Sequence, residues 1–186
     1  MTIELRRCVL PHAPLEFVCA SSARDGLLAA DWLERDAPRA DVPGGALPLP
    51  SGLRAAIDRA RRQRRDAPVI PPFDPLDFLR DPQVWRAPDD VPQGSEHARR
   101  VWRALCRIPV GETRTYGEIA REIGSSPRAV GQACRANPWP LFVPCHRVVP
   151  GRGARTPNPA GAYAGQLEGP LAGVKAWLLE HEASGT

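Results

Sequence analysis

The residues best suited to chemistry lie side by side at Cys145 and His146, between Pro144 and Arg147. A free cysteine thiol has a pKa of about 8.5, so little of it is thiolate at neutral pH unless a base lies nearby. Because neighbours in an extended strand point to opposite faces, the pair can cooperate only if Pro144 begins a tight turn. The pattern indicates a nucleophilic sulfur. The alternative is that Cys145 simply fills an apolar core.

Two short helices are predicted immediately before this segment. Thr115 and Glu118 form a capping box at the start of the first helix, and Gly124 suits the left-handed residue that ends a helix. Ser126 then caps a second helix that has Pro127 at its first position. Two helices joined by such a short turn are typical of a helix-turn-helix motif, which would place a DNA-binding element next to the cysteine.

The rest of the chain predicts an α+β protein with two lobes. The first, residues 1–90, is a small mixed α/β lobe with two strands, near residues 3–9 and 15–20, and a helix from Ser51 that ends before Pro68. The polar stretch 86–95 is predicted to be a linker. The second lobe, residues 91–186, is mostly helical and includes a further helix carrying Val101, Leu105 and Ile108.

Composition excludes several classes of protein. Of the 186 residues, 42% are hydrophobic and 25% charged, as in globular proteins, and no apolar run is long enough to span a membrane. The N-terminus lacks the features of a secretory signal. Five cysteines without a CxxC pair argue against a disulfide framework and favour the reducing cytoplasm. A zinc site at Cys8, His12 and Cys19 stays open, although the spacing is irregular and a fourth ligand is not evident.

Positive charge is concentrated in the second lobe. Residues 1–90 carry a net charge of −1 and residues 91–186 a net charge of +5, with +8 between Arg99 and Arg155. All but one of the 25 basic residues are arginines. Such a segment either binds a polyanion or is an ordinary solvated surface, and the adjacent helix-turn-helix favours DNA.

Five ordered sequence blocks resemble the C-terminal domain of the O6-alkylguanine-DNA alkyltransferases over residues 99–182. They are Ile108-Pro-x-Gly-Glu-x-x-Thr-Tyr-Gly-Glu118, Arg128-Ala-Val-Gly131, Arg135-x-Asn-Pro138, Pro144-Cys-His-Arg-Val148 and Trp177-Leu-Leu-x-His-Glu182. The first lobe is similar to the family only in length and mixed character. The resemblance implies an RNase H-like scaffold followed by a winged-helix-like DNA-binding domain.

The resemblance also implies a reaction that each molecule performs once. Cys145 would take the alkyl group from O6 of guanine, without cofactor or metal. His146, linked through a water to Glu182, would act as the general base, and Tyr116 would donate its hydroxyl to guanine N3. Two further residues would have structural roles at the site: Asn137 and Pro144.

The implied partner is double-stranded DNA bearing O6-alkylguanine, bound as a monomer through the minor groove, with cooperative binding along DNA left open. The damaged nucleotide would have to rotate out of the duplex, and Arg128 would fill the space that it leaves. The residues expected to contact DNA or the rotated base are Arg128, Ala129, Gln132, Arg135, Arg147, Val148 and Tyr163.

Three other functions are alternatives to alkyl transfer. A damage sensor without chemistry would lack the acceptor cysteine. A helix-turn-helix regulator would leave the Cys145 and Trp177 blocks unexplained. A cysteine hydrolase would need an oxyanion hole for which no motif is visible. The segment 150–176 is longer than the resemblance leads us to expect, and Arg152 and Arg155 within it are predicted to touch DNA phosphates.

Overall fold

The computed structural model describes residues 3–9, 15–34, 51–62, 68–151 and 160–184. The chain divides into two compact units, Met1–Pro71 and Pro72–Thr186.

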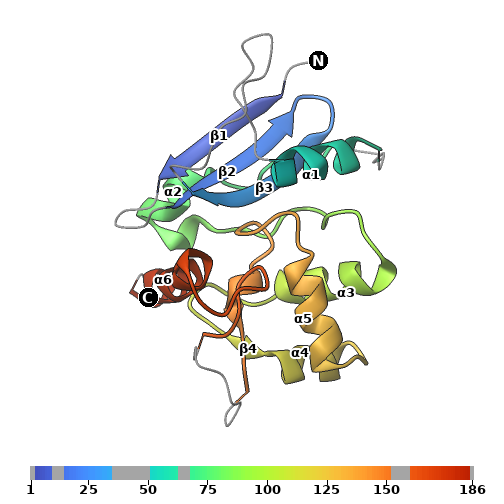
Figure 1. The fold of residues 1–186 in the computed structure, drawn as a ribbon, viewed down its shortest axis with the longest axis vertical. Helices are drawn as coiled ribbons and strands as arrows, with labels where there is room; N and C mark the ends of the chain where they lie inside the picture. The colour runs from blue at the N-terminus through green and yellow to red at the C-terminus, as the bar shows by residue number, and fades with distance from the viewer. Residues whose placement is uncertain (1–2, 10–14, 35–50, 63–67, 152–159, 185–186) are drawn as a thin grey trace. The chain divides into compact units, whose positions relative to one another are not determined.

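The N-terminal unit contains an antiparallel sheet of three strands in the order β1-β2-β3 (Figure 1). The strands are β1 (Glu4–Val9), β2 (Leu15–Ser22) and β3 (Gly26–Glu34). Phe17 on β2 lies opposite Cys8 on one side and Trp32 on the other, and the Phe17 and Trp32 rings are 4.9 Å apart. Aromatic pairs across neighbouring strands stabilise a sheet beyond the area that they bury.

One helix, α1 (Ser51–Arg62), packs on this sheet (Figure 1). Leu53 and Ile57 are four residues apart, so they lie on one face of the helix. Both are buried against Val18 and Leu28 of the sheet. The described part of this unit therefore agrees with the small mixed lobe expected from the sequence, with β3 as an unpredicted addition.

The C-terminal unit is mostly helical, as predicted. It contains α2 (Pro75–Arg80), η1 (Pro82–Val84), α3 (Glu96–Leu105), β4 (Arg114–Thr115), α4 (Tyr116–Glu122), α5 (Pro127–Arg135), η2 (Cys145–Arg147), β5 (Val148–Val149) and α6 (Pro170–Ser184). β4 and β5 form a short parallel pair. α5 packs against both α3 and α4, and the Trp102 indole of α3 donates a hydrogen bond of 2.9 Å to the Ala133 carbonyl of α5.

Side-chain caps define the helix ends that matter for the site. The Thr115 hydroxyl accepts from the Glu118 amide while the Glu118 carboxylate accepts from the Thr115 amide, which confirms the capping box. Ser126 caps α5 with Pro127 at its first turn, and Gly124 has a φ of +63°. These three features set the turn between α4 and α5.

The boundary between the compact units lies before the linker that the sequence predicted between residues 86 and 95. Residues 72–90 belong to the C-terminal unit, because their side chains and carbonyls pack there. The Trp85 indole donates to the Leu141 carbonyl at 3.1 Å, and the His181 ring donates to the Phe78 carbonyl at 2.9 Å.

The described residues bear on two expectations from the sequence: the open zinc site at Cys8, His12 and Cys19, and the absence of a membrane-spanning segment. Cys8 and Cys19 are buried and form no disulfide with another described cysteine, whereas His12 lies outside the described residues. Within the described part, no group of three or more His, Cys, Asp or Glu side chains is placed to hold a metal. In the same part of the chain, every helix is too short or too polar to cross a bilayer.

Candidate functional site

A tight turn presents Cys145, as its pairing with His146 requires. The turn is a single 3-10 segment in which the Arg147 amide donates to the Pro144 carbonyl at 3.1 Å. The Asn137 side-chain amide holds the approach to the turn by donating to the Val143 carbonyl at 2.9 Å. Because consecutive residues of a 3-10 segment point in different directions, Cys145 and His146 contact different surroundings.

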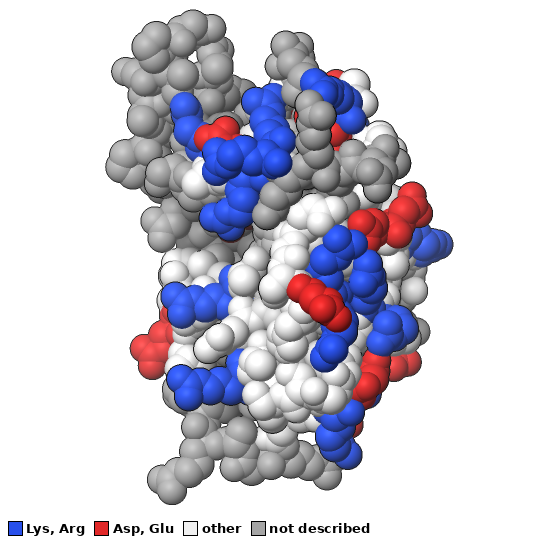
Figure 2. Space-filling view, turned by 90° about the vertical axis from the view of Figure 1, so that its right-hand side faces the viewer, with Lys and Arg blue, Asp and Glu red and all other residues white. Residues whose placement is uncertain are grey.

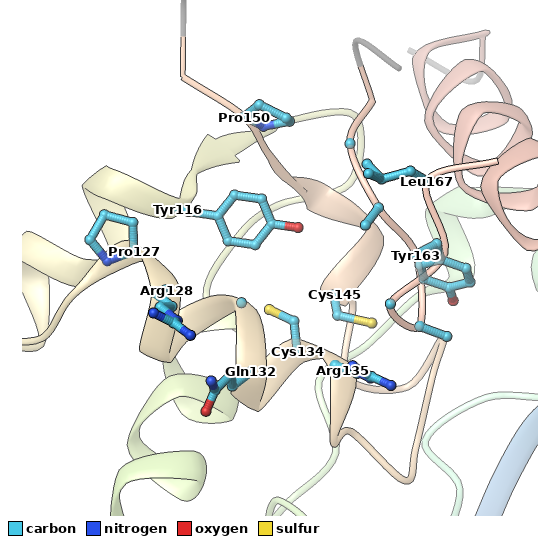
Figure 3. A pocket seen from close by; sticks show the side chains of 15 residues that line it. Tyr116, Pro127, Arg128, Gln132, Cys134, Arg135, Cys145, Pro150, Tyr163 and Leu167 are labelled. Carbon is cyan, nitrogen blue, oxygen red and sulfur yellow. The ribbon is translucent and has the colours of Figure 1, made fainter. Parts of the chain in front are cut away.

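Cys145 faces a cavity of about 450 Å³ in the C-terminal unit (Figure 3). Its residue is only 6% exposed. Side chains from α4, α5 and the segment before α6 line the cavity: Tyr116, Pro127, Arg128, Gly131, Gln132, Cys134, Arg135, Cys145, Pro150, Gly161, Ala162, Tyr163, Ala164, Gly165 and Leu167. The volume and the mixture of apolar walls with a few polar groups are typical of a small-molecule site.

His146 faces away from this cavity, into the interior. Its Nε2 lies 2.8 Å from Oε1 of Glu182 on α6, and both side chains are almost completely buried. The predicted water bridge between His146 and Glu182 is therefore wrong, since the two side chains are in direct contact. His146 Nδ1 is buried without a hydrogen-bond partner among the described residues.

Arg147 completes this buried cluster. Its guanidinium donates to both Glu182 carboxylate oxygens at 2.9 to 3.2 Å and to the Ile108 carbonyl at 2.6 Å. It also lies 4.1 Å from the centre of the Trp85 ring. The expectation that Arg147 contacts DNA is corrected, because the residue is 0% exposed and its donors are directed to Glu182 and Ile108.

The cluster fixes the protonation of its members. Burial by itself would raise the pKa of Glu182, but His146 and Arg147 outweigh it and bring that pKa down to about 2. Burial lowers the pKa of His146 despite the adjacent carboxylate, so we assign a neutral imidazole. With Nε2–H donating to Glu182, the lone pair is on Nδ1. His146 is thus arranged to accept a proton at Nδ1.

The Cys145 thiol is protonated at rest. Burial raises its pKa, while hydrogen bonds from Asn137 and Tyr163 and the charge of Lys175 act in the opposite direction. The Asn137 amide lies 3.4 Å from the sulfur. These groups would stabilise a thiolate that forms during reaction, and a base is still needed to remove the proton.

Lys175 is a buried cation near the site that the sequence analysis missed. The only lysine of the chain is fully buried, donates to the Val148 carbonyl at 2.7 Å and the Ala162 carbonyl at 3.2 Å, and lies 5.8 Å from the centre of the Tyr116 ring. Burial lowers its pKa to about 8, against the opposing effects of Cys145 and Cys134. One lysine among 24 arginines was the signal that could have drawn attention to it.

The structure separates the remaining predicted residues into two groups. Arg128, Gln132, Arg135, Tyr116 and Tyr163 line the cavity. Outside the lining are Ala129, which is half-buried, and Val148, which is buried. Arg152 and Arg155 lie outside the described residues.

Ion pairs neutralise much of the positive charge in this unit, and Figure 2 shows acidic and basic side chains interleaved over part of the surface. Asp90 pairs with Arg99 and Arg103, and Glu122 pairs with Arg107 and Arg114. Arg128 and Arg135, in contrast, have no carboxylate at ion-pair distance among the described residues. The cavity-lining arginines of α5 therefore carry positive charge that no described carboxylate neutralises.

Comparison with known proteins agrees with this geometry. Residues 96–184 match the family model of the 6-O-methylguanine DNA methyltransferase DNA-binding domain. The chain is 53% identical over 94 residues to the methylated-DNA–protein-cysteine methyltransferase of Methanosarcina mazei, which covers 50% of this chain and 53% of that protein. The chain thus spans about half the length of the curated relatives that it matches.

Solved structures extend the similarity over the whole chain. A variant of the Mycobacterium tuberculosis O6-methylguanine methyltransferase is 30% identical, with a TM-score of 0.56, covering 100% of this chain and 95% of that chain. The M. tuberculosis protein OGT in complex with DNA is 29% identical, with a TM-score of 0.58, covering 98% of this chain and 94% of that chain.

Proposed function

Because the chain belongs to the family of methylated-DNA–protein-cysteine methyltransferases, we propose that it repairs DNA by moving the alkyl group of O6-alkylguanine onto its own Cys145. The observation that carries this proposal is the placement of the Cys145 sulfur on a cavity, one residue before a buried histidine and carboxylate. The Cys145 nucleophile thus faces the cavity where the substrate would bind, whereas the His146 base is buried outside that cavity.

The reaction is a displacement at carbon. The thiol proton passes by way of a water to Nδ1 of His146, which lies outside the cavity, as the Cys145 sulfur attacks the alkyl carbon bonded to guanine O6, and the carbon–oxygen bond breaks. Glu182 stabilises the imidazolium that forms, as a carboxylate does for a general base elsewhere. Asn137 and Lys175 stabilise the sulfur while it carries negative charge.

Tyr116 assists the departure of guanine. Burial raises the pKa of its hydroxyl, and negative charge forming on Cys134 or Cys145 would raise that pKa further, so the phenol keeps its proton and donates to guanine N3. The purine then leaves without becoming a full anion. The product is a stable thioether at Cys145, and the acceptor thiol is not regenerated, so each chain reacts once.

DNA would be the partner that brings the alkylguanine to the cavity. Guanine O6 is inaccessible inside a duplex, so the nucleotide must rotate out. We propose that α4 and α5 act as a helix-turn-helix approaching from the minor groove, with the chain bound as a monomer. Arg128 at the first turn of α5 would fill the vacated space, and the small Ala129, Ala133 and Ala136 would permit close approach.

A labelled substrate tests the proposal. The protein is mixed with a duplex that carries one O6-methylguanine with an isotope-labelled methyl group, in varying ratios. One label per chain should move to protein, and Cys145→Ser should abolish the transfer. Cys106→Ser is the matched control and should retain it, since that residue is not part of the cavity lining. Turnover beyond one label per chain, or label that stays on DNA, would overturn the proposal.

A further inference from the structure

A second thiol shares the cavity with the acceptor cysteine and has no role in the proposed reaction. Cys134 lies on α5, and its side chain lines the same cavity as Cys145. Figure 3 shows both sulfur atoms among the side chains that line the cavity. Cys134 is half-buried and faces this space.

The two thiols are also linked electrostatically. Burial raises the pKa of Cys134, and a charge on Cys145 raises it further, whereas the Lys175 ammonium lowers it. The same Lys175 charge acts on Cys145. Two nucleophilic atoms therefore share one cavity and one buried cation. The other described cysteines, Cys8, Cys19 and Cys106, are not among the cavity-lining residues.

We propose that Cys134 captures alkyl groups that carry a second leaving group, closing a thioether bridge between Cys134 and Cys145. The substrates are O6-(2-haloethyl)guanines in DNA. The inference rests on the proposed function, because Cys145 must first accept the haloethyl group.

The chemistry balances without an oxidant or a cofactor. Transfer from guanine O6 leaves Cys145 as a 2-haloethyl thioether, which is a half-mustard. Its sulfur displaces the halide to give a three-membered episulfonium ring. The Cys134 sulfur attacks a ring carbon, one carbon–sulfur bond of the ring breaks, and the Cys134 proton leaves to solvent. The net products are one ethylene bridge, one halide ion and one proton.

Without Cys134 the same intermediate would have other fates. The cavity lies beside the residues proposed to hold DNA, so an episulfonium ion formed there would meet either water or a nucleophilic base. Water would give a hydroxyethyl thioether, and a base would give a protein–DNA crosslink. Cys134 is held on the wall of the same cavity, so its sulfur competes with water and with DNA bases for the ring, and the bridge confines the reactive group to the repair protein.

Intact-protein mass spectrometry tests the inference. The full chain is treated with a freshly prepared duplex carrying O6-(2-chloroethyl)guanine and, separately, with the O6-methylguanine duplex. The bridged chain gains the mass of an ethylene unit less two hydrogens, whereas a hydrolysed product gains that of a hydroxyethyl group less one hydrogen. Digestion should then yield one crosslinked peptide pair containing Cys134 and Cys145.

The variants separate the possible outcomes. Cys134→Ala should lose the bridge and instead form the hydroxyethyl product and protein–DNA crosslinks, and Cys134→Ser serves if the alanine variant fails to fold. Cys106→Ser should still form the bridge. A hydroxyethyl or crosslinked product from the wild-type chain, or a bridge in Cys134→Ala, would overturn the inference. A wild-type chain that fails with the methylated duplex as well would instead show that the proposed function itself is wrong.

Discussion

Replacing Glu182 with glutamine probes the buried cluster behind Cys145. The carboxylate accepts from His146 and from both Arg147 donors that face it, and its Oε2 also accepts from the Gly111 amide at 3.3 Å. Glutamine keeps the shape but removes the charge and turns one acceptor into a donor. Arg147 would then remain as a buried guanidinium without a counter-charge.

The cost of Glu182→Gln can be estimated from that loss. Removing one partner of a buried ion pair costs about 3–5 kcal/mol, a large part of the roughly 5–15 kcal/mol that stabilises a typical domain. With a urea dependence of about 2 kcal/mol per M, the unfolding midpoint should fall by about 2 M. The rate of alkyl transfer should fall by about 100- to 10,000-fold, the usual contribution of a general base.

Acid denaturation gives an independent estimate of how much Glu182 contributes to the free energy of unfolding. The pKa of Glu182 is about 2 in the folded chain, against an ordinary value of 4.5. Its stabilising contribution is therefore complete above pH 4.5 and is lost as the pH falls toward 2. The shift corresponds to about 3 kcal/mol. Glu182→Gln should lose this pH dependence.

Two further variants make the test decisive. Glu180→Gln, on the exposed face of the same helix, should change the unfolding free energy by less than about 0.5 kcal/mol. The double variant Arg147→Met/Glu182→Met removes both charges and should regain most of the stability while alkyl transfer stays slow. Urea unfolding and single-turnover kinetics measure the two effects. A double variant as unstable as Glu182→Gln would refute the reasoning.

Three other predictions concern the cavity. Arg128→Ala should slow transfer from duplex DNA much more than transfer from a free O6-alkylguanine base, and an equal loss with both substrates would count against its proposed place in the duplex. Gly165→Ala should lower the free energy of unfolding in urea by about 1–3 kcal/mol, because Gly165 has a φ of +86° and a Cβ there would lie 2.7 Å from the Arg135 Nε. An unchanged free energy of unfolding would contradict this close packing. Methylation of Cys145 should lower the melting temperature, since the thioether loses the thiol proton and must fit beside Asn137 and Tyr163, and a higher melting temperature after reaction would argue against this.

Local sequence signals predicted the helices around the site. The capping box at Thr115 and the Ser126 cap act within one turn of the chain, so the sequence shows them without knowledge of the fold. The turn at Pro144 was predictable for a similar reason. The resemblance to a family then directed attention to His146 and Glu182, whose contact spans 36 residues of sequence.

Features that depend on long-range packing were missed or misplaced. β3 is rich in leucine and alanine, which favour helices, and its pairing with β2 decides its conformation. Arg147 was expected to contact DNA, although its partner is a buried carboxylate. Lys175 gave no sign of burial because its partners are the backbone carbonyls of distant residues.

Peptide mapping after reaction with the O6-methylguanine duplex tests the central claim most directly. We predict that fragmentation of the digested protein will locate one methyl group per chain on the Cys145 sulfur, with Cys8, Cys19, Cys106 and Cys134 unmodified. A methyl group on any of those four thiols, or a fully unmodified Cys145 after the DNA has lost its methyl group, would contradict the account.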